Sequence, residues 1–121
     1  MTDPKAFFSG IPGGKVLDVA TGGGSFIHFL LETLPAIEEV VGLDNNERAA
    51  AAFAAAFADR PAVRFQQGDA LQAPFPDASF DTVCIANSLH HFDDPAAVLT
   101  EMVRLLRPGG AFIFSEMFAD G

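Results

Sequence analysis

Short apolar runs alternate along this chain with segments in which apolar residues recur every three or four positions. Such runs are typical of buried strands, and the periodic segments are typical of amphipathic helices. The runs cover five stretches, residues 16–19, 39–44, 63–66, 80–86 and 111–115. Strands and helices that alternate at this spacing predict right-handed βαβ units, in which a doubly wound parallel sheet carries helices on both faces.

Two helices are predicted in the first half of the chain. The first follows a glycine turn at residues 22–24, and Pro35 ends it. Its single apolar face consists of Phe26, Ile27, Leu30, Leu31 and Leu34. The second is rich in alanine, is capped by Asn45 or Asn46, and runs to about Ala58. Its inner face contains two phenylalanines, Phe53 and Phe57.

A third helix is predicted between the fourth and fifth strands. Asp94 is its expected N-cap, and Pro95 occupies its first position. Its expected inner face consists of Val98, Leu99, Met102, Val103 and Leu106. Arg104 and Arg107 would complement the dipole at its C-terminal end, and the turn 108–110 would lead into the last strand.

Length, composition and charge restrict the possible functions. The 121 residues are enough for one domain, which we place at 15–121 after a lead-in at 1–14. The formal charge of -9 argues against a nucleic-acid or anionic-membrane partner, because both require clustered cations. The single cysteine, Cys84, indicates a reducing compartment and hence the cytoplasm. The sequence has no membrane-spanning run and predicts no metal site.

Polar residues and glycines follow four of the predicted strands. They are Asp18 with the glycines 22–24, then Asp44, then residues 68–70, and finally residues 87–91. Each has a simpler explanation: a glycine turn can serve packing alone, an acid can cap a helix, and Asp69 can close a local turn. However, the carboxyl ends of parallel strands are where open sheets bind ligands. Asp44 also lies 20 residues after Gly24, about the interval expected for a ribose-binding acid.

The glycine pattern and the acids distinguish between two kinds of nucleotide cofactor. A dinucleotide site prefers G-x-G-x-x-G, and the third glycine is absent here. Asp18 precedes the glycines and would repel a pyrophosphate. Together with Asp44 and Asp69 it would form an acidic cradle, which favours a sulfonium cofactor that carries an ammonium group. We therefore expect S-adenosylmethionine and rank a dinucleotide site far below it.

The same segments resemble the class I S-adenosylmethionine-dependent methyltransferases, and especially the small-molecule group that includes ubiquinone and menaquinone C-methyltransferases. The resemblance spans roughly residues 15–115. The segments that carry it are VLDVATGGG at 16–24, VGLD at 41–44, GDA at 68–70, PFPDASFDTV at 74–83, LHHF at 89–92 and LRPGG at 106–110. It departs from the family pattern at Ala20, where the family has its first glycine.

The resemblance also implies roles for individual residues. Asp18 and the glycine backbone would contact the methionine end, Asp44 the ribose hydroxyls, and Asp69 with Ala70 the adenine. Asn87 would lie beside the methyl donor. The full set of expected cofactor-binding residues is Asp18, Ala20, Thr21, Gly22, Gly24, Asp44, Asn45, Gly68, Asp69, Ala70 and Asn87.

The expected reaction is methyl transfer to a small molecule by in-line displacement. Proximity and orientation would supply much of the rate. A base is needed only for a protonated acceptor, and the candidates are His90 and His91, since a neutral imidazole accepts a proton near pH 7. The alternative is a core that binds the cofactor without turnover.

The predicted sheet is smaller than that of the family it resembles. The family fold has seven strands, whereas this sequence predicts five and lacks the last two. The fifth strand would then present an apolar edge, which is unfavourable for a soluble monomer. Three explanations are open: a partial domain, a homodimer paired through the fifth-strand edge, or a natural minimal member of the family.

Overall fold

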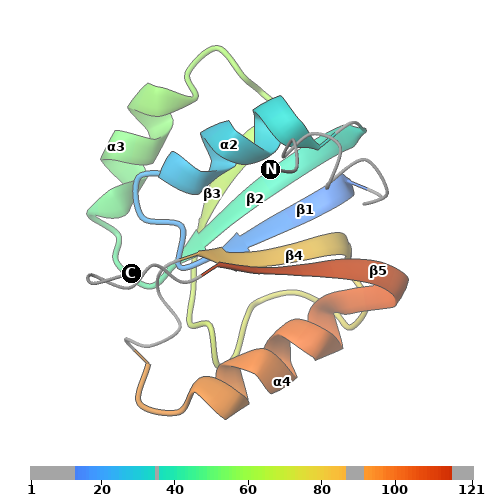
Figure 1. Cartoon of the computed structure of the whole chain (residues 1–121). Coiled ribbons are helices and arrows are strands. Elements are labelled where there is room, and N and C mark those ends of the chain that lie inside the picture. Colours follow the sequence, from blue (N-terminus) through green and yellow to red (C-terminus); the bar gives the residue numbers. More distant parts are fainter. Residues whose placement is uncertain (1–12, 35, 87–91, 116–121) are drawn as a thin grey trace, which may run out of the picture.

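One parallel sheet forms the centre of the protein in a computed structural model that describes residues 13–34, 36–86 and 92–115. Its strand order is β3-β2-β1-β4-β5, and every neighbouring pair is parallel (Figure 1). The strands are β1 Gly14–Val19, β2 Ile37–Asp44, β3 Val63–Gln67, β4 Phe80–Ala86 and β5 Leu106–Ser115. The predicted five-stranded parallel sheet is confirmed, and β4 has the predicted bounds.

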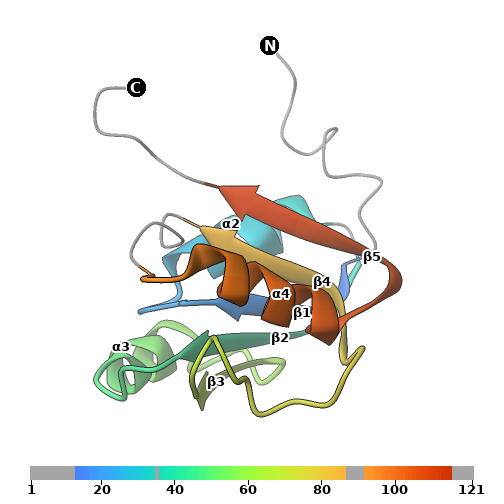
Figure 2. The same cartoon turned by 90° about the horizontal axis from the view of Figure 1, so that it is seen from below.

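Helices cover both faces of the sheet, as predicted. Helices α2 (Ser25–Thr33) and α3 (Ala49–Ala56) lie on one face, and α4 (Pro95–Leu105) lies on the other (Figures 1 and 2). No helix in the described part of the chain is long and apolar enough to cross a membrane.

Successive side chains of a strand point to opposite faces of the sheet, so the apolar core has two layers. In β1, Val16 packs with α2 and α3, whereas Leu17 and Val19 pack on the α4 side. The layer under α2 and α3 includes Ile27, Leu30, Val40, Phe53, Phe57 and Cys84. The layer under α4 includes Leu43, Val83, Ile85, Val98, Met102 and Leu105. Strands with two buried faces produce near-continuous apolar runs, and this is the pattern in the sequence.

The direction of the chain through the sheet reverses beside β1. From β1 the chain proceeds to β2 and β3 on one side, and it then returns to add β4 and β5 on the other. The return from β3 to β4 is a loop, residues 68–79, without a helix. Open α/β sheets bind ligands at such a reversal, outside the carboxyl ends of the strands. The topology therefore places a candidate site where β1 and β4 end.

The predicted cap of α3 is wrong. The helix begins at Ala49, and the residue in the cap position is Arg48, which makes no side-chain cap hydrogen bond. The Asn46 side chain instead accepts a hydrogen bond from the backbone N–H of Arg48 at 3.0 Å. This bond closes a turn before the helix, so Asn46 ends the loop rather than capping the first helical turn.

The predicted inner face of α4 needs two corrections. Val103 is 67% exposed, and the buried residues of the helix are Val98, Met102 and Leu105. Leu106 is the first residue of β5, so it does not belong to the helix. The predicted cap is confirmed, because the Asp94 carboxylate accepts a hydrogen bond from the N–H of Ala97 at 3.1 Å.

The segment predicted as a turn before β5 is a bulge within the strand. Leu106 pairs with Phe80 and Ala111 pairs with Thr82, so residues 107–110 lie opposite Asp81 alone. Gly109 has a φ of +81°, which favours glycine. Arg107 therefore lies in the strand, where it forms an ion pair with Asp81 at 3.0 Å, and it does not lie at the end of α4.

Candidate functional site

The turn after β1 has a left-handed backbone at several positions. Ala20 has a φ of +57°, Gly22 of +55° and Gly24 of +88°. Gly24 has a second requirement, because a Cβ there would lie 2.5 Å from Cε2 of Phe57. Gly24 thus lets the start of α2 pack closely against α3, whereas a Cβ on Gly22 would meet nothing within 4 Å.

Asp44 connects this turn to the end of β2. One carboxylate oxygen accepts a hydrogen bond from the N–H of Gly22 at 2.8 Å, and the other accepts one from the N–H of Asn46 at 2.8 Å. The N–H of Thr21 also donates to the carbonyl oxygen of Leu43 at 2.9 Å. The Asp44 carboxylate therefore holds two loops in place at the carboxyl edge of the sheet.

Asp18 is a buried carboxylic acid on β1, between Gly42 and Cys84 in the sheet register. It is 2% exposed, and it accepts a hydrogen bond from the Thr21 hydroxyl at 2.8 Å. Burial raises the pKa of Asp18 from 3.8 to about 7, the Thr21 bond opposes that rise, and the charge of Asp44 adds to it. The side chain therefore gains or loses its proton near neutrality.

Two cavities lie along this edge. The first has a volume of about 260 Å³. It is lined by Asp18, Ala20, Thr21, Gly22, Gly23, Ser25, Phe26 and Ala86. The second has a volume of about 190 Å³. It is lined by Ala20, Leu43, Asp44, Asn45, Gly68, Asp69, Ala70 and Phe92. Ala20 lines both, so the two cavities neighbour each other at this residue and together make up the candidate site.

The region from 68 to 70 shows both a structural and a lining role. The Asp69 carboxylate accepts a hydrogen bond from the N–H of Leu71 at 2.8 Å, so it does close a local turn. The same residue lines the second cavity. A Cβ on Gly68 would lie 2.9 Å from Cδ of Pro74, so glycine is required there for close packing.

Most of the residues expected from the sequence therefore converge on this site. Gly24 lines neither cavity, and it shapes the turn instead. Asn87, His90 and His91 lie outside the described residues.

Sequence reasoning missed several lining residues. Phe26 was assigned to the helix core and Ala86 to a strand end, although both line the first cavity. Phe92 belongs to the LHHF segment at 89–92, for which the sequence predicts no role at this residue, and it lines the second cavity. Their positions directly after the strand-end segments were the available signal.

The described residues contain no group of three or more His, Cys, Asp or Glu side chains that could hold a metal ion. A hollow of about 450 Å³ lies beside the start of β2 and β3, with Leu34, Ile37, Arg60 and Val63 among its lining residues. It is larger than the two cavities, but it lies at the amino ends of the strands, away from the expected ligand edge.

The comparison with protein families agrees with this geometry. The model of a family described as a methyltransferase domain matches residues 17–114. The chain belongs to this family. This methyltransferase domain is 44% identical over 103 residues to the demethylmenaquinone methyltransferase of Deinococcus radiodurans, covering 84% of the chain and 42% of that protein. It thus spans less than half the length of that curated relative.

Solved structures share the fold of the methyltransferase domain. The crystal structure of YcgJ from Bacillus subtilis matches with a TM-score of 0.81 and 27% identity, over 95% of this chain and 49% of that one. An S-adenosylmethionine-dependent methyltransferase from Mesorhizobium loti matches with a TM-score of 0.75 and 27% identity, over 92% and 50%.

Proposed function

We propose that this domain binds S-adenosylmethionine in the two adjoining cavities and takes part in methyl transfer to a small molecule. The observation that carries the proposal is the meeting of the two cavities at Ala20, with Asp18 lining one and Asp44 and Asp69 lining the other. Acidic walls suit a cofactor that carries a sulfonium and an ammonium group. Family membership supports the same cofactor.

The first cavity is the place for the methionine end. The ionised Asp18 carboxylate attracts the ammonium group, and Thr21 orients that carboxylate through its hydroxyl. The backbone around Ala20 and Gly22 forms another part of the wall. Because glycine has no side chain, a ligand can approach this bend closely.

The second cavity is the place for the nucleoside. A carboxylate has about four acceptor positions, so Asp44 can accept two ribose hydroxyls in addition to its two backbone N–H groups. Asp69 and Ala70 take the adenine, while Asn45 and Gly68 form further parts of the wall.

The bound cofactor supplies an activated methyl group, and the chain has to position it and exclude water. We propose Asn87 as a neighbour of the methyl donor and His90 or His91 as the base for an acceptor that arrives protonated. The Deinococcus radiodurans relative is named a demethylmenaquinone methyltransferase. We therefore propose a quinone-type ring as the first acceptor to test.

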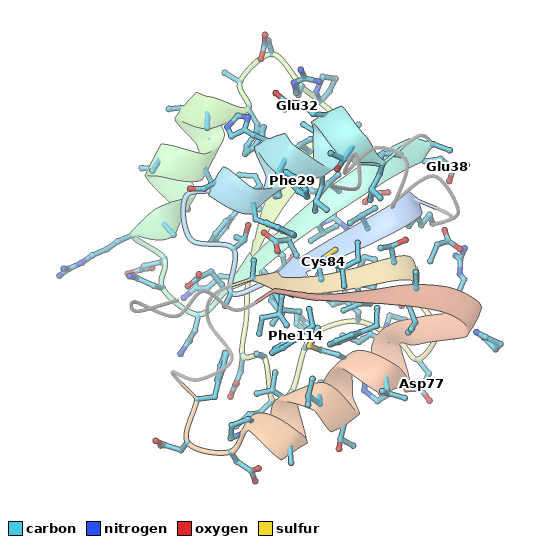
Figure 3. All side chains as sticks on the ribbon, viewed as in Figure 1. Phe29, Glu32, Glu38, Asp77, Cys84 and Phe114 are labelled. Carbon is cyan, nitrogen blue, oxygen red and sulfur yellow. The ribbon has the colours of Figure 1, made fainter. Side chains whose placement is uncertain are left out.

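Calorimetric titration with S-adenosylmethionine and with NAD tests cofactor binding directly. We expect heat with the first ligand, and heat with NAD alone would overturn the proposal. Asp44→Ala should weaken binding by about 1.5–3 kcal/mol, the scale of hydrogen bonds to a charged group. Glu38→Ala is the matched control, because it removes an exposed acid far from the cavities (Figure 3). Equal affinity of wild type and Asp44→Ala would remove Asp44 from the site.

Turnover is tested separately on quinone, phenol and amine acceptors with a labelled methyl group. Transfer to a quinone would support the proposed reaction. Binding of S-adenosylmethionine without transfer to any acceptor would show that this chain is a cofactor-binding core only.

We further propose that the domain functions in the cytoplasm, does not bind nucleic acid, and forms a homodimer through the β5 edge. The net charge of -9 disfavours a polyanionic partner. Cys84 is a free, buried cysteine, and burial raises its pKa well above the ordinary value, so it stays a thiol. At β5, the exposed fractions are 38% for Phe112 and 48% for Phe114.

A further inference from the structure

The two sides of the second cavity belong to segments far apart in the sequence. One side is the start of the loop 68–79, with Asp69 and Ala70. The other side includes Phe92, which lies just before α4. The separation of these two sides therefore depends on how the loop is held against α4.

Arg104 of α4 holds the loop with its whole guanidinium group. Nε and Nη2 each donate to the Glu101 carboxylate at 2.7 Å. Nη1 donates to the carbonyl oxygen of Phe75 at 3.0 Å and to the Asp77 carboxylate at 2.8 Å. Nη2 also donates to the carbonyl oxygen of Ala73 at 3.2 Å. Such a planar fork cannot be reproduced by a lysine ammonium.

Glu101 completes the attachment. Its second oxygen accepts a hydrogen bond from the N–H of Ala73 at 2.8 Å, and its side chain is only 12% exposed. The hydrogen bonds from Arg104 lower the pKa of the Glu101 carboxyl, so it remains ionised at neutral pH. Asp77 is different, because its side chain is 80% exposed at the outer end of the network (Figure 3).

Ala73, the loop residue that Glu101 and Arg104 bind, lies close in sequence to the cavity wall. Ala73 is three residues after Ala70, and both are buried in the core layer under α4. Neither Glu101 nor Arg104 lines either cavity. Any effect of this pair on a ligand must therefore pass through the loop.

We propose that Glu101 and Arg104 are positioning residues of the cofactor site, which set the distance between Ala70 and Phe92 by fixing Ala73 and Phe75 to α4. This inference rests on the proposed function, because it assumes that the second cavity receives the nucleoside. Removal of either side chain frees the loop, so the nucleoside loses a wall while the residues around Asp18 are unchanged.

The experiment measures the dissociation constant for S-adenosylmethionine in Glu101→Ala and Arg104→Ala, well below their unfolding temperatures. We expect affinity to fall about tenfold, which corresponds to about 1.4 kcal/mol of binding free energy. Hydrogen exchange at the amide of Ala73 should accelerate in Glu101→Ala, because this amide donates to the Glu101 carboxylate. The amide of Ala78 is the internal reference, because its acceptor is the main-chain carbonyl of residue 104, which both variants keep. Glu101→Gln keeps only one of the two acceptor oxygens and loses the charge, so it should restore part of the affinity that Glu101→Ala loses.

The control is Arg64→Ala, which breaks the ion pair of Arg64 with Glu39 at 3.1 Å on the β2–β3 side of the sheet. It should leave the affinity unchanged. If the alanine variants fail to fold, Arg104→Lys replaces them in the binding measurement. It keeps the positive charge and removes the planar guanidinium group. A folded Arg104 variant with wild-type affinity and only a lower melting temperature would overturn the inference. If the wild type itself does not bind S-adenosylmethionine, the proposed function fails as well.

Discussion

The Asp18 carboxyl group is buried, accepts a hydrogen bond from the Thr21 hydroxyl, and lies near the charge of Asp44. Its pKa is raised from 3.8 to about 7, so the folded protein keeps a proton that the unfolded chain releases between these values. Stability therefore falls as the pH rises from about 4 to about 7, and the whole loss is present above pH 7. A cationic ligand would reverse this loss, because it favours the ionised form.

Asp18→Asn tests this linkage, because asparagine cannot ionise and can still accept the Thr21 hydrogen bond. Compared with wild type, the variant should gain free energy of unfolding as the pH rises from 4 to 8. The gain should approach 4 kcal/mol, since a tenfold change in proton affinity is worth about 1.4 kcal/mol. Urea unfolding at pH 4 and pH 8 measures the difference. A gain that is equal at both pH values would contradict the assignment.

Ala20 shows why the family pattern has a glycine at this position. Its φ of +57° costs an alanine about 1–2 kcal/mol, while glycine adopts this conformation freely. Ala20→Gly relieves this strain but adds entropy to the unfolded chain, so the two effects nearly cancel and stability should change by less than about 1 kcal/mol. Ala20→Val should lose roughly 1–3 kcal/mol, because a β-branched residue tolerates this conformation poorly. Equal denaturation midpoints for the two variants would rule out strain at this bend.

At the scale of elements, α4 shows how a helix is started by its own sequence and oriented by its surroundings. The Asp94 side chain and Pro95 determine where it begins. Which stripe faces the sheet is a different matter. The apolar positions allow either Val103 or Leu105 to face inward, and the structure exposes Val103. In this orientation Leu105 is buried, and Arg104 donates hydrogen bonds to the carbonyl oxygens of Ala73 and Phe75 in the 68–79 loop.

Asp94→Ala should destabilise the protein by about 1 kcal/mol, because the N–H of Ala97 loses its acceptor. Asp93→Ala is the control, since it removes an adjacent exposed acid that is not the cap. Urea midpoints compared across the three proteins measure the effect. Equal losses in both variants would mean that charge, rather than the cap bond, is responsible.

At the scale of the whole molecule, helices cover both faces of the sheet (Figure 1), whereas the edge strand β5 leaves apolar side chains exposed. β5 is an edge strand of the sheet, and Ile113 packs under α2 and α3. Because side chains alternate along a strand, the flanking Phe112 and Phe114 point to the α4 side, where Figure 3 shows Phe114. Phe112 and Phe114 remain substantially exposed there. An exposed apolar edge favours association, because it offers both unpaired backbone groups and apolar area.

Sedimentation velocity across a range of concentrations tests the proposed homodimer. The wild-type chain should associate, whereas Phe112→Thr with Phe114→Thr should remain monomeric, because the apolar area that promotes association is removed. Val103→Thr serves as the control, since it removes an exposed apolar residue from α4. A monomeric wild type would exclude pairing through this edge.

The sequence by itself determined which segments form strands and which form helices. It also determined which acids lie near the carboxyl ends of the strands. This information is local, because the period of apolar residues distinguishes strand from helix, and caps and glycines mark the boundaries. It was sufficient to place Asp18, Asp44 and Asp69 at one edge of a parallel sheet, since all strands of such a sheet end on the same side. It was less accurate at caps and helix faces, as Arg48 and Val103 show.

Only the tertiary structure decided how distant segments meet. The bond from Gly22 to Asp44, the attachment of Ala73 to Glu101, and the placement of Phe92 in the same cavity wall as Ala70 each join parts far apart in the chain. The raised pKa of Asp18 likewise requires burial by elements on every side. Such contacts depend on strand order and on packing, which a local pattern of apolar and polar residues does not encode.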